Sequence, residues 1–138
     1  MKRNIFLLIA VALLTGATYE AMSQPSSNST MKDQPVNQLR HIVLLKFKDS
    51  STPAQVKEVE NAFSVLPGKI NTITGYEWGT NVSPENLAQG FTHCFMVSFK
   101  DQADRDKYLP HAAHKDFVKI LTPHLDKVLV IDFVGKIK

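Results

Sequence analysis

The residues of this chain that could do chemistry are mainly histidines. The sequence has 138 residues and contains five histidines and one cysteine. His41 and His93 fall in stretches expected to form strands, whereas His111 and His114 fall in a loop between two helical segments. Because imidazole titrates near neutral pH, a histidine that faces an apolar pocket can act as a general acid or base. These four histidines are therefore candidates for a binding or catalytic site.

Each histidine also has a structural interpretation. His41 and His93 could be core residues held by hydrogen bonds. His111 and His114 are three residues apart and could share one helical face as metal ligands, but no cysteine or carboxylate stands at a recognisable ligand spacing from them. We therefore predict no metal site and no cofactor. His124 is expected at a solvated helix end.

The cysteine, Cys94, directly follows His93. Adjacent residues of a strand point to opposite faces, so this thiol and imidazole cannot readily share a proton. We expect a buried, inert thiol. A single cysteine also excludes an intramolecular disulfide framework and a cysteine-rich zinc site.

The elements that must position these side chains follow the order βαββαβ. The first helix has a clear start, because Thr52 is a good N-cap, Pro53 suits the first helical position and Gln55 completes a capping box. Pro67-Gly68 is expected to end it. Alternating or apolar runs predict the strands, and apolar stripes predict two further helical segments. The expected strands cover 40–47, 73–82, 91–99 and 128–134, and the later helical segments cover 101–108 and 115–125.

This order predicts a ferredoxin-like α+β fold, a four-stranded antiparallel sheet with its helices on one face. The other face should then be polar, yet strands 40–47 and 128–134 are apolar on both faces. Helices from one chain can cover only one of these faces. The simplest cover for the second is a homodimer through the sheet face, which forms a dimeric α/β barrel. The alternatives are the N-terminal leader or a different partner protein.

The N-terminal residues resemble a targeting segment. Lys2 and Arg3 precede an apolar run at 5–14, and Ala21-Met22-Ser23 offers a cleavage site. The run is shorter than the roughly 20 residues that span a membrane. We therefore expect a signal peptide at 1–23, a flexible leader at 24–38 and one domain at 39–138, with a secreted or periplasmic location and no membrane attachment after cleavage. A retained anchor is the alternative.

Composition and charge narrow the class of protein further. With 43% hydrophobic and 21% charged residues, the chain has the balance of a folded domain. Its net charge of +3 moves closer to zero once the signal is removed. The basic residues are scattered among acids, so we predict no nucleic-acid partner.

Five motifs, taken in order, resemble the stress-responsive A/B barrel (Dabb) domain family. This family is a dimeric ferredoxin-like group that includes plant heat-stable stress proteins and a polyketide cyclase. One difference is Ala112, which stands where the family commonly has proline. The motifs lie at 41–49, at 78–79 with 85–87, at 89–93, at 108–114 and at 126–133.

The resemblance implies roles for particular residues. In the family's polyketide cyclase, the position matching His114 is the base for an aldol closure, and that matching Tyr108 orients it and the substrate. Positions matching His41 and His93 lie near the cavity, and we expect His111 beside it. The same pattern occurs in members without an assigned activity. The resemblance thus implies a homodimer that binds a small apolar or aromatic molecule, or alternatively a cofactor-independent lyase or isomerase. An exported protein would rarely meet a polyketide synthase, which argues against the cyclase reaction itself.

Overall fold

The computed structural model describes residues 37–136. The predictions of a signal peptide at 1–23 and of most of the leader at 24–38 lie outside the described residues. The described chain contains four strands, four α-helices and one short 3-10 helix. They are β1 (Leu39–Phe47), α1 (Pro53–Ser64), α2 (Leu66–Lys69), β2 (Ile73–Thr80), β3 (His93–Phe99), α3 (Gln102–Tyr108), α4 (Ala112–Leu121), η2 (Thr122–His124) and β4 (Leu125–Val134).

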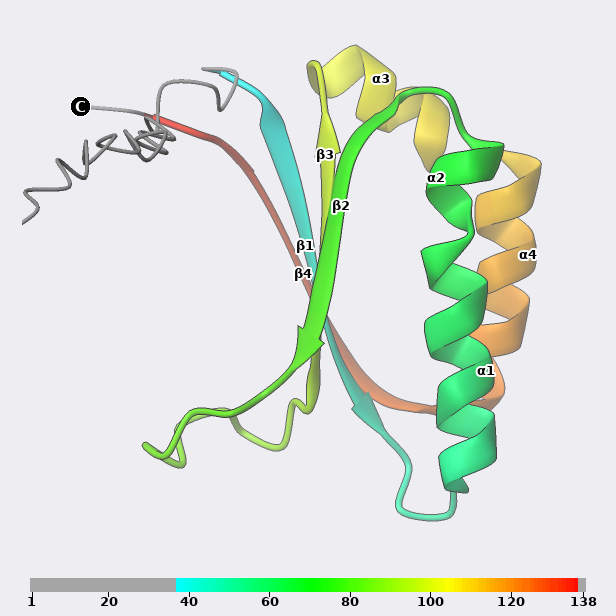
Figure 1. Ribbon diagram of the computed structural model, residues 1–138, viewed down its shortest axis with the longest axis vertical. Helices are drawn as coiled ribbons and strands as arrows, with labels where there is room; N and C mark the ends of the chain where they lie inside the picture. Colours follow the sequence, from blue (N-terminus) through cyan, green and yellow to red (C-terminus); the bar gives the residue numbers. More distant parts are fainter. Residues whose placement is uncertain (1–36, 137–138) are drawn as a thin grey trace, which may run out of the picture. The chain divides into compact units, whose positions relative to one another are not determined.

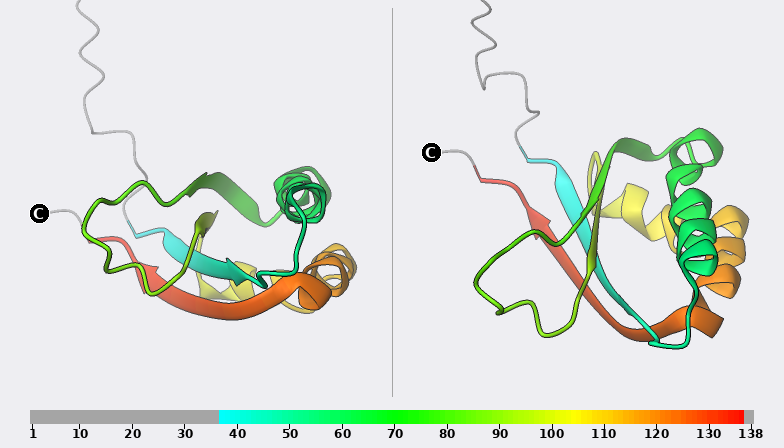
Figure 2. Two further views of the ribbon diagram at one scale, coloured as in Figure 1. Left: turned by 90° about the horizontal axis from the view of Figure 1, so that it is seen from below. Right: turned by 60° about the horizontal axis from the view of Figure 1, so that its bottom comes forward.

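The strands form one antiparallel sheet in the order β2-β3-β1-β4. All the helices lie on one side of this sheet, and the other side is open (Figure 1). Helices α1 and α4 run side by side, as both views in Figure 2 show. The predicted ferredoxin-like α+β fold, with its antiparallel sheet and one helical layer, is confirmed. Within the described residues, no helix is both long enough and apolar enough to cross a membrane.

The start of α1 matches the sequence prediction. The side chain of Thr52 accepts a hydrogen bond from the backbone N–H of Gln55, and the side chain of Gln55 accepts one from the backbone N–H of Thr52. This reciprocal bonding satisfies two N–H groups that the first helical turn leaves free. The predicted end is less accurate, because α1 ends at Ser64 and a separate helical turn, α2, contains Pro67 and Gly68.

The second half of the helical layer differs from its predicted boundaries. Helix α4 begins at Ala112 rather than 115, because the His111 side chain caps it by accepting from the backbone N–H of Ala113. His111 and His114 therefore do not share a loop: the first is the N-cap and the second lies within the first turn. The helix ends earlier than expected, since Pro123 lies in η2 and β4 already begins at Leu125.

The core lies between the sheet and the helices. Phe63 of α1 stacks on Phe95 of β3, with ring centroids 4.4 Å apart, and contacts Phe117 of α4 at 4.5 Å. In β1 the helix-facing residues His41, Val43 and Leu45 are buried, and the residues between them are half-buried. This alternation follows from the two-residue repeat of a strand.

The open face of the sheet is also apolar, as the strand sequences predict. Register places Ile42 between Met96 and Ile131 on this face, and Leu44 opposite Leu129. Ile131 and Phe133 of the edge strand β4 are each 47% exposed. Apolar side chains gathered on one face in this way are typical of a surface that another molecule covers.

Candidate functional site

The first element of the site is a buried histidine tied to an edge strand. His41 is only 5% exposed, and its Nδ1 lies 2.6 Å from Oδ1 of Asp132 on the neighbouring strand β4. A carboxylate can only accept, so Nδ1 donates the hydrogen. The other carboxylate oxygen of Asp132 accepts from Nη1 of Arg105 on α3. Asp132 therefore connects β1 to α3 and fixes the orientation of the His41 ring.

The second element is Tyr108, the last residue of α3. Its side chain is fully buried, and its hydroxyl has no hydrogen-bond partner among the described residues. Burial raises the pKa of this phenol well above its ordinary value, so the hydroxyl keeps its proton. The ring contacts those of His41 and His114, with centroids 5.8 and 4.3 Å away. A buried O–H donor without a partner is costly to keep, and such groups recur where a ligand binds.

The third element is His114, half-buried in the first turn of α4. Its Nδ1 lies 2.9 Å from the carbonyl oxygen of Leu109, which can only accept, so Nδ1 carries the hydrogen. The neutral ring then has its lone pair on Nε2. Burial lowers the pKa of His114, an effect that the Leu109 bond opposes and that nearby positive charge on His41 and His111 reinforces. His114 is therefore a neutral proton acceptor at neutral pH.

These three side chains border one cavity of about 350 Å³ between the sheet and helices α3 and α4. Its wall is otherwise mostly apolar. The further lining residues are Val43, Phe63, Arg105, Leu109, Phe117, Val118, Leu121, Thr122, Leu125, Val128, Val130 and Asp132. An apolar cavity with a few convergent polar groups is the usual form of a small-molecule site. Between residues 37 and 136, no group of three or more His, Cys, Asp or Glu side chains is arranged to hold a metal ion.

The structure places two of the expected pocket residues elsewhere. His111 is exposed and caps α4 instead of lining the cavity. His93 is buried near the opposite end of the strands, where its Nε2 donates to Oε1 of Glu60 at 3.2 Å and its Nδ1 lies 2.8 Å from the Thr92 hydroxyl. The bonds of His93 match the alternative of a core histidine held by hydrogen bonds.

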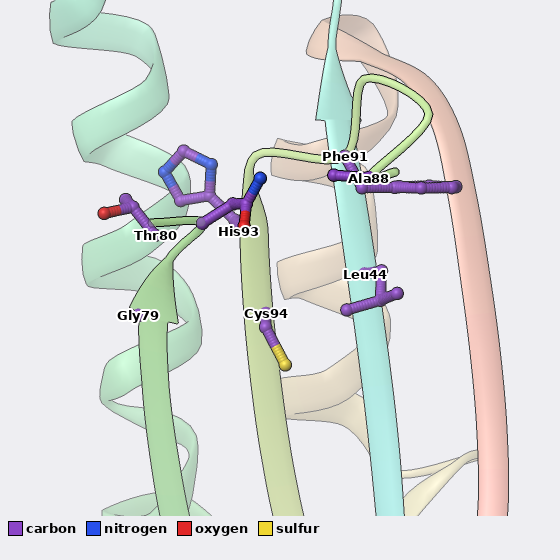
Figure 3. A pocket seen from close by; sticks show the side chains of 8 residues that line it. Leu44, Gly79, Thr80, Ala88, Phe91, His93 and Cys94 are labelled. Carbon is purple, nitrogen blue, oxygen red and sulfur yellow. The ribbon is translucent and has the colours of Figure 1, made fainter. Parts of the chain in front are cut away.

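His93 and Cys94 do lie on opposite faces of the sheet. In Figure 3 the His93 ring points toward the pale green helix α1, and the sulfur of Cys94 points away from it. Leu44, Phe91 and Cys94 border a separate hollow of about 280 Å³. The expectation of a buried thiol is wrong, because Cys94 lies on the open face, where the described chain leaves it exposed. Partial burial nevertheless raises the pKa of the thiol, so it stays protonated and unreactive. His124 ends η2 and is half-buried.

Sequence reasoning missed three charged residues that organise these histidines. Asp132 accepts a hydrogen bond from His41 and another from Arg105, and Glu60 accepts one from His93. A signal for Asp132 was available, because it alternates in phase with Val128 and Val130, which face the helices. A carboxylate on the inner face of an apolar strand needs a partner. Arg105 and Glu60 lie on helices and carry no comparable signal.

Comparison with known proteins identifies the family to which this architecture belongs. The family model described as "Stress responsive A/B Barrel Domain" matches residues 39–135. The chain belongs to this family. Among curated A/B barrel proteins, it is 38% identical to stress-response A/B barrel domain-containing protein HS1 of Arabidopsis thaliana over 95 residues, which are 69% of this chain and 87% of HS1. It is 30% identical to olivetolic acid cyclase of Cannabis sativa over 98 residues, 71% of this chain and 97% of the cyclase.

Solved structures agree with the fold. Hydroxynitrile lyase from Passiflora edulis superposes with a TM-score of 0.69 at 25% identity, covering 74% of this chain and 96% of the lyase. A protein of unknown function from Bacteroides fragilis, described as dimeric with a ferredoxin-like fold, superposes with a TM-score of 0.59 at 26% identity, covering 71% and 96% of the two chains. The relatives of this A/B barrel protein thus include stress-response proteins and lyase-like enzymes.

Proposed function

We propose that this A/B barrel protein binds a small apolar or aromatic molecule in the cavity bordered by His41, Tyr108 and His114. The observation that carries the proposal is the apolar cavity of about 350 Å³ whose wall includes His41, Tyr108 and His114, together with the Tyr108 hydroxyl, which is buried without a partner among the described residues. A ligand with a hydrogen-bond acceptor would satisfy this group, and its apolar part would lie against the hydrophobic wall. Binding would therefore remove an energetic cost that the free protein bears.

Titration calorimetry with a panel of aromatic ketones, phenols and alkyl-substituted aromatics tests this proposal. Tyr108→Phe removes the donor but keeps the ring. Since one hydrogen bond contributes about 0.5–1.5 kcal/mol, we expect this change to weaken binding by about two- to tenfold. His124→Ala, outside the cavity, is the matched control and should bind as the wild type does. Equal affinity of the Tyr108→Phe variant and the wild type would contradict the proposed site.

The second candidate function is cofactor-independent catalysis at the same cavity, as a lyase, cyclase or isomerase. Its specific support is the state of His114, whose pKa is lowered by burial and whose Nδ1 is occupied by the Leu109 carbonyl. Nε2 can therefore take a proton from a substrate, while the Tyr108 hydroxyl donates to the carbonyl oxygen on which negative charge develops. Relatives named as a cyclase and a hydroxynitrile lyase favour this type of chemistry.

Turnover measurements with the same carbonyl compounds separate catalysis from binding. A general base contributes about 10²- to 10⁴-fold to the rate, so His114→Ala should lower kcat by at least about a hundredfold if His114 acts in this way. We expect Tyr108→Phe to lower kcat as well. Turnover by both variants at the wild-type rate would exclude the catalytic role and leave the binding role intact.

The proposal also includes export and self-association. The basic and apolar N-terminal residues support a cleaved signal peptide and a secreted or periplasmic location. The apolar open face, together with a relative described as dimeric, supports a homodimer through the sheet face. Intact-mass measurement of the protein from the extracellular or periplasmic fraction tests the first point, since an unprocessed N-terminus would contradict it. A stable monomer at micromolar concentration in sedimentation would contradict the second.

A further inference from the structure

We propose that the cavity selects uncharged ligands and rejects carboxylates, because the arginine in its wall is already neutralised by an aspartate of the same wall. The inference rests on the proposed small-molecule binding and concerns the class of ligand. Of the described residues that line the cavity, Arg105 and Asp132 are the two with permanent opposite charges, and they are paired with each other.

The pairing of Arg105 is extensive. Its Nη1 donates to Oδ2 of Asp132, and its Nε donates to Oδ1 of Asp106 at 2.9 Å. Its side chain is 17% exposed, and that of Asp132 is 27% exposed. Asp132 also accepts from Nδ1 of His41 through its other oxygen. Both carboxylate oxygens of Asp132, and the Nη1 and Nε groups of Arg105, thus have partners before any ligand enters.

A carboxylate ligand would meet two costs at this site. It would have to displace Asp132 from Arg105, which leaves the Asp132 charge without its partner, or it would have to bind beside Asp132 at an arginine whose positive charge already faces two carboxylates, those of Asp132 and Asp106. Like charges at close range repel, and a charge moved from water into an apolar wall loses hydration that nothing replaces. An arginine in a cavity usually indicates an anion site, but the ion pair reverses that expectation here.

The remaining polar groups suit a neutral molecule with one acceptor and one donor. The hydroxyl of Thr122 is occupied, because it donates to the Val118 carbonyl at 2.7 Å. Tyr108 offers an unpartnered O–H donor, and the neutral ring of His114 has an acceptor nitrogen. A primary amide, a hydroxyketone or a comparable uncharged head group can use both, while an alkyl or aromatic tail contacts the hydrophobic wall.

Two probes of the same shape but different charge test the inference. We would measure the affinities of 4-propylbenzamide and 4-propylbenzoate by calorimetry at pH 8, where the benzoate carries a full negative charge and the amide is neutral. The wild type should bind the amide at least about tenfold more tightly, a difference of about 1.4 kcal/mol. Asp132→Asn keeps the shape of the side chain but removes the negative charge that balances Arg105 within the cavity wall, so the preference for the amide should fall by at least about tenfold or reverse.

Asp106→Asn is the matched control. It removes a carboxylate partner of the same arginine, but one that does not line the cavity, and should leave the ratio of the two affinities within about twofold of the wild-type ratio. Tighter or equal binding of the benzoate by the wild type would overturn the inference while leaving the binding function in place. An unchanged ratio in the Asp132→Asn variant would overturn it too. If the wild type bound neither probe nor any compound of the wider panel, the binding function would fail and the inference with it.

Discussion

The partnerless hydroxyl of Tyr108 leads to an unusual prediction: removing it should stabilise the ligand-free protein. The Tyr108 side chain is fully buried, and its hydroxyl is one of two buried side-chain polar atoms without a partner among the described residues. In Tyr108→Phe the aromatic ring, its contacts with Phe99 and His114 and the backbone of α3 are all retained. The change therefore deletes a desolvated polar group and little else.

The size of the effect follows from the cost of an unmade hydrogen bond. A buried polar group without a partner costs about 1–3 kcal/mol, so the free energy of unfolding should rise by about that amount. For a domain of this size, each 1 kcal/mol corresponds to a rise in Tm of about 4–8 °C. Urea and thermal unfolding followed by circular dichroism would measure the change, at one fixed protein concentration because the proposed self-association would also shift Tm.

Tyr76→Phe provides a control of opposite sign. The Tyr76 hydroxyl has a partner, the Ser64 hydroxyl at 3.1 Å, and its ring also contacts Phe63. Its removal should lower stability by up to about 1 kcal/mol. If Tyr108→Phe were as destabilising as Tyr76→Phe, the Tyr108 hydroxyl would have a partner in the folded protein, and the argument for a ligand at this position would lose its basis.

Four further predictions follow from other parts of the structure. Burial opposes ionisation of Glu60, but its bonds to Lys57 and His93 outweigh this effect and lower its pKa. The stabilisation that ionised Glu60 contributes is therefore present above about pH 4.5 and is lost as the pH falls through the lower pKa of the folded state. Glu60→Gln should flatten this dependence on acid pH in unfolding curves measured from pH 3 to 7. Ala112→Pro should raise the free energy of unfolding by about 0.4–1 kcal/mol in urea titrations. The reason is that Ala112 occupies the first position of α4 and the backbone of the preceding residue is extended, as proline requires. A loss of stability would show that proline does not fit there. If the protein forms the proposed dimer, Ile131→Asp should shift it to a monomer in sedimentation experiments, and an unchanged dimer would move the interface to another surface. Because burial lowers the pKa of His114 from its ordinary value of 6.5, any base-catalysed turnover should rise with pH and reach half its maximum below pH 6.5, and a midpoint above pH 6.5 would point to a different base.

Much of the fold could be predicted because local signals and the global pattern agree. The reciprocal bonds of Thr52 and Gln55 are visible in the sequence as a capping box. The two-residue alternation of β1 and β4 correctly separates the helix-facing side chains from those on the open face. The start of α4 could not be predicted in this way, since histidine is not among the residues that usually cap helices and His111 acts as the cap here.

Which residues share the cavity was harder to predict than the strand or helix on which each residue lies. His41 and His93 both face the helices, but register pairs His41 with Val97, four residues along β3 from His93. At about 3.3 Å per residue, this offset separates the two side chains by about 13 Å along the strands, and it places His93 against Glu60 of α1 instead of in the cavity beneath α3 and α4. Facing direction follows from sequence periodicity, whereas position along a strand depends on register, which the motifs alone did not give.

Strand β4 connects two parts of the protein that could otherwise change independently. Asp132 points toward the cavity, and its neighbours Ile131 and Phe133 point toward the open face proposed for self-association. A one-residue insertion or slip in this strand would exchange these directions, placing the carboxylate among apolar side chains and taking it away from His41 and Arg105. Any change of register in β4 would therefore alter the proposed dimer surface and the ion pair of the cavity at the same time, so that neither can change through this strand without the other.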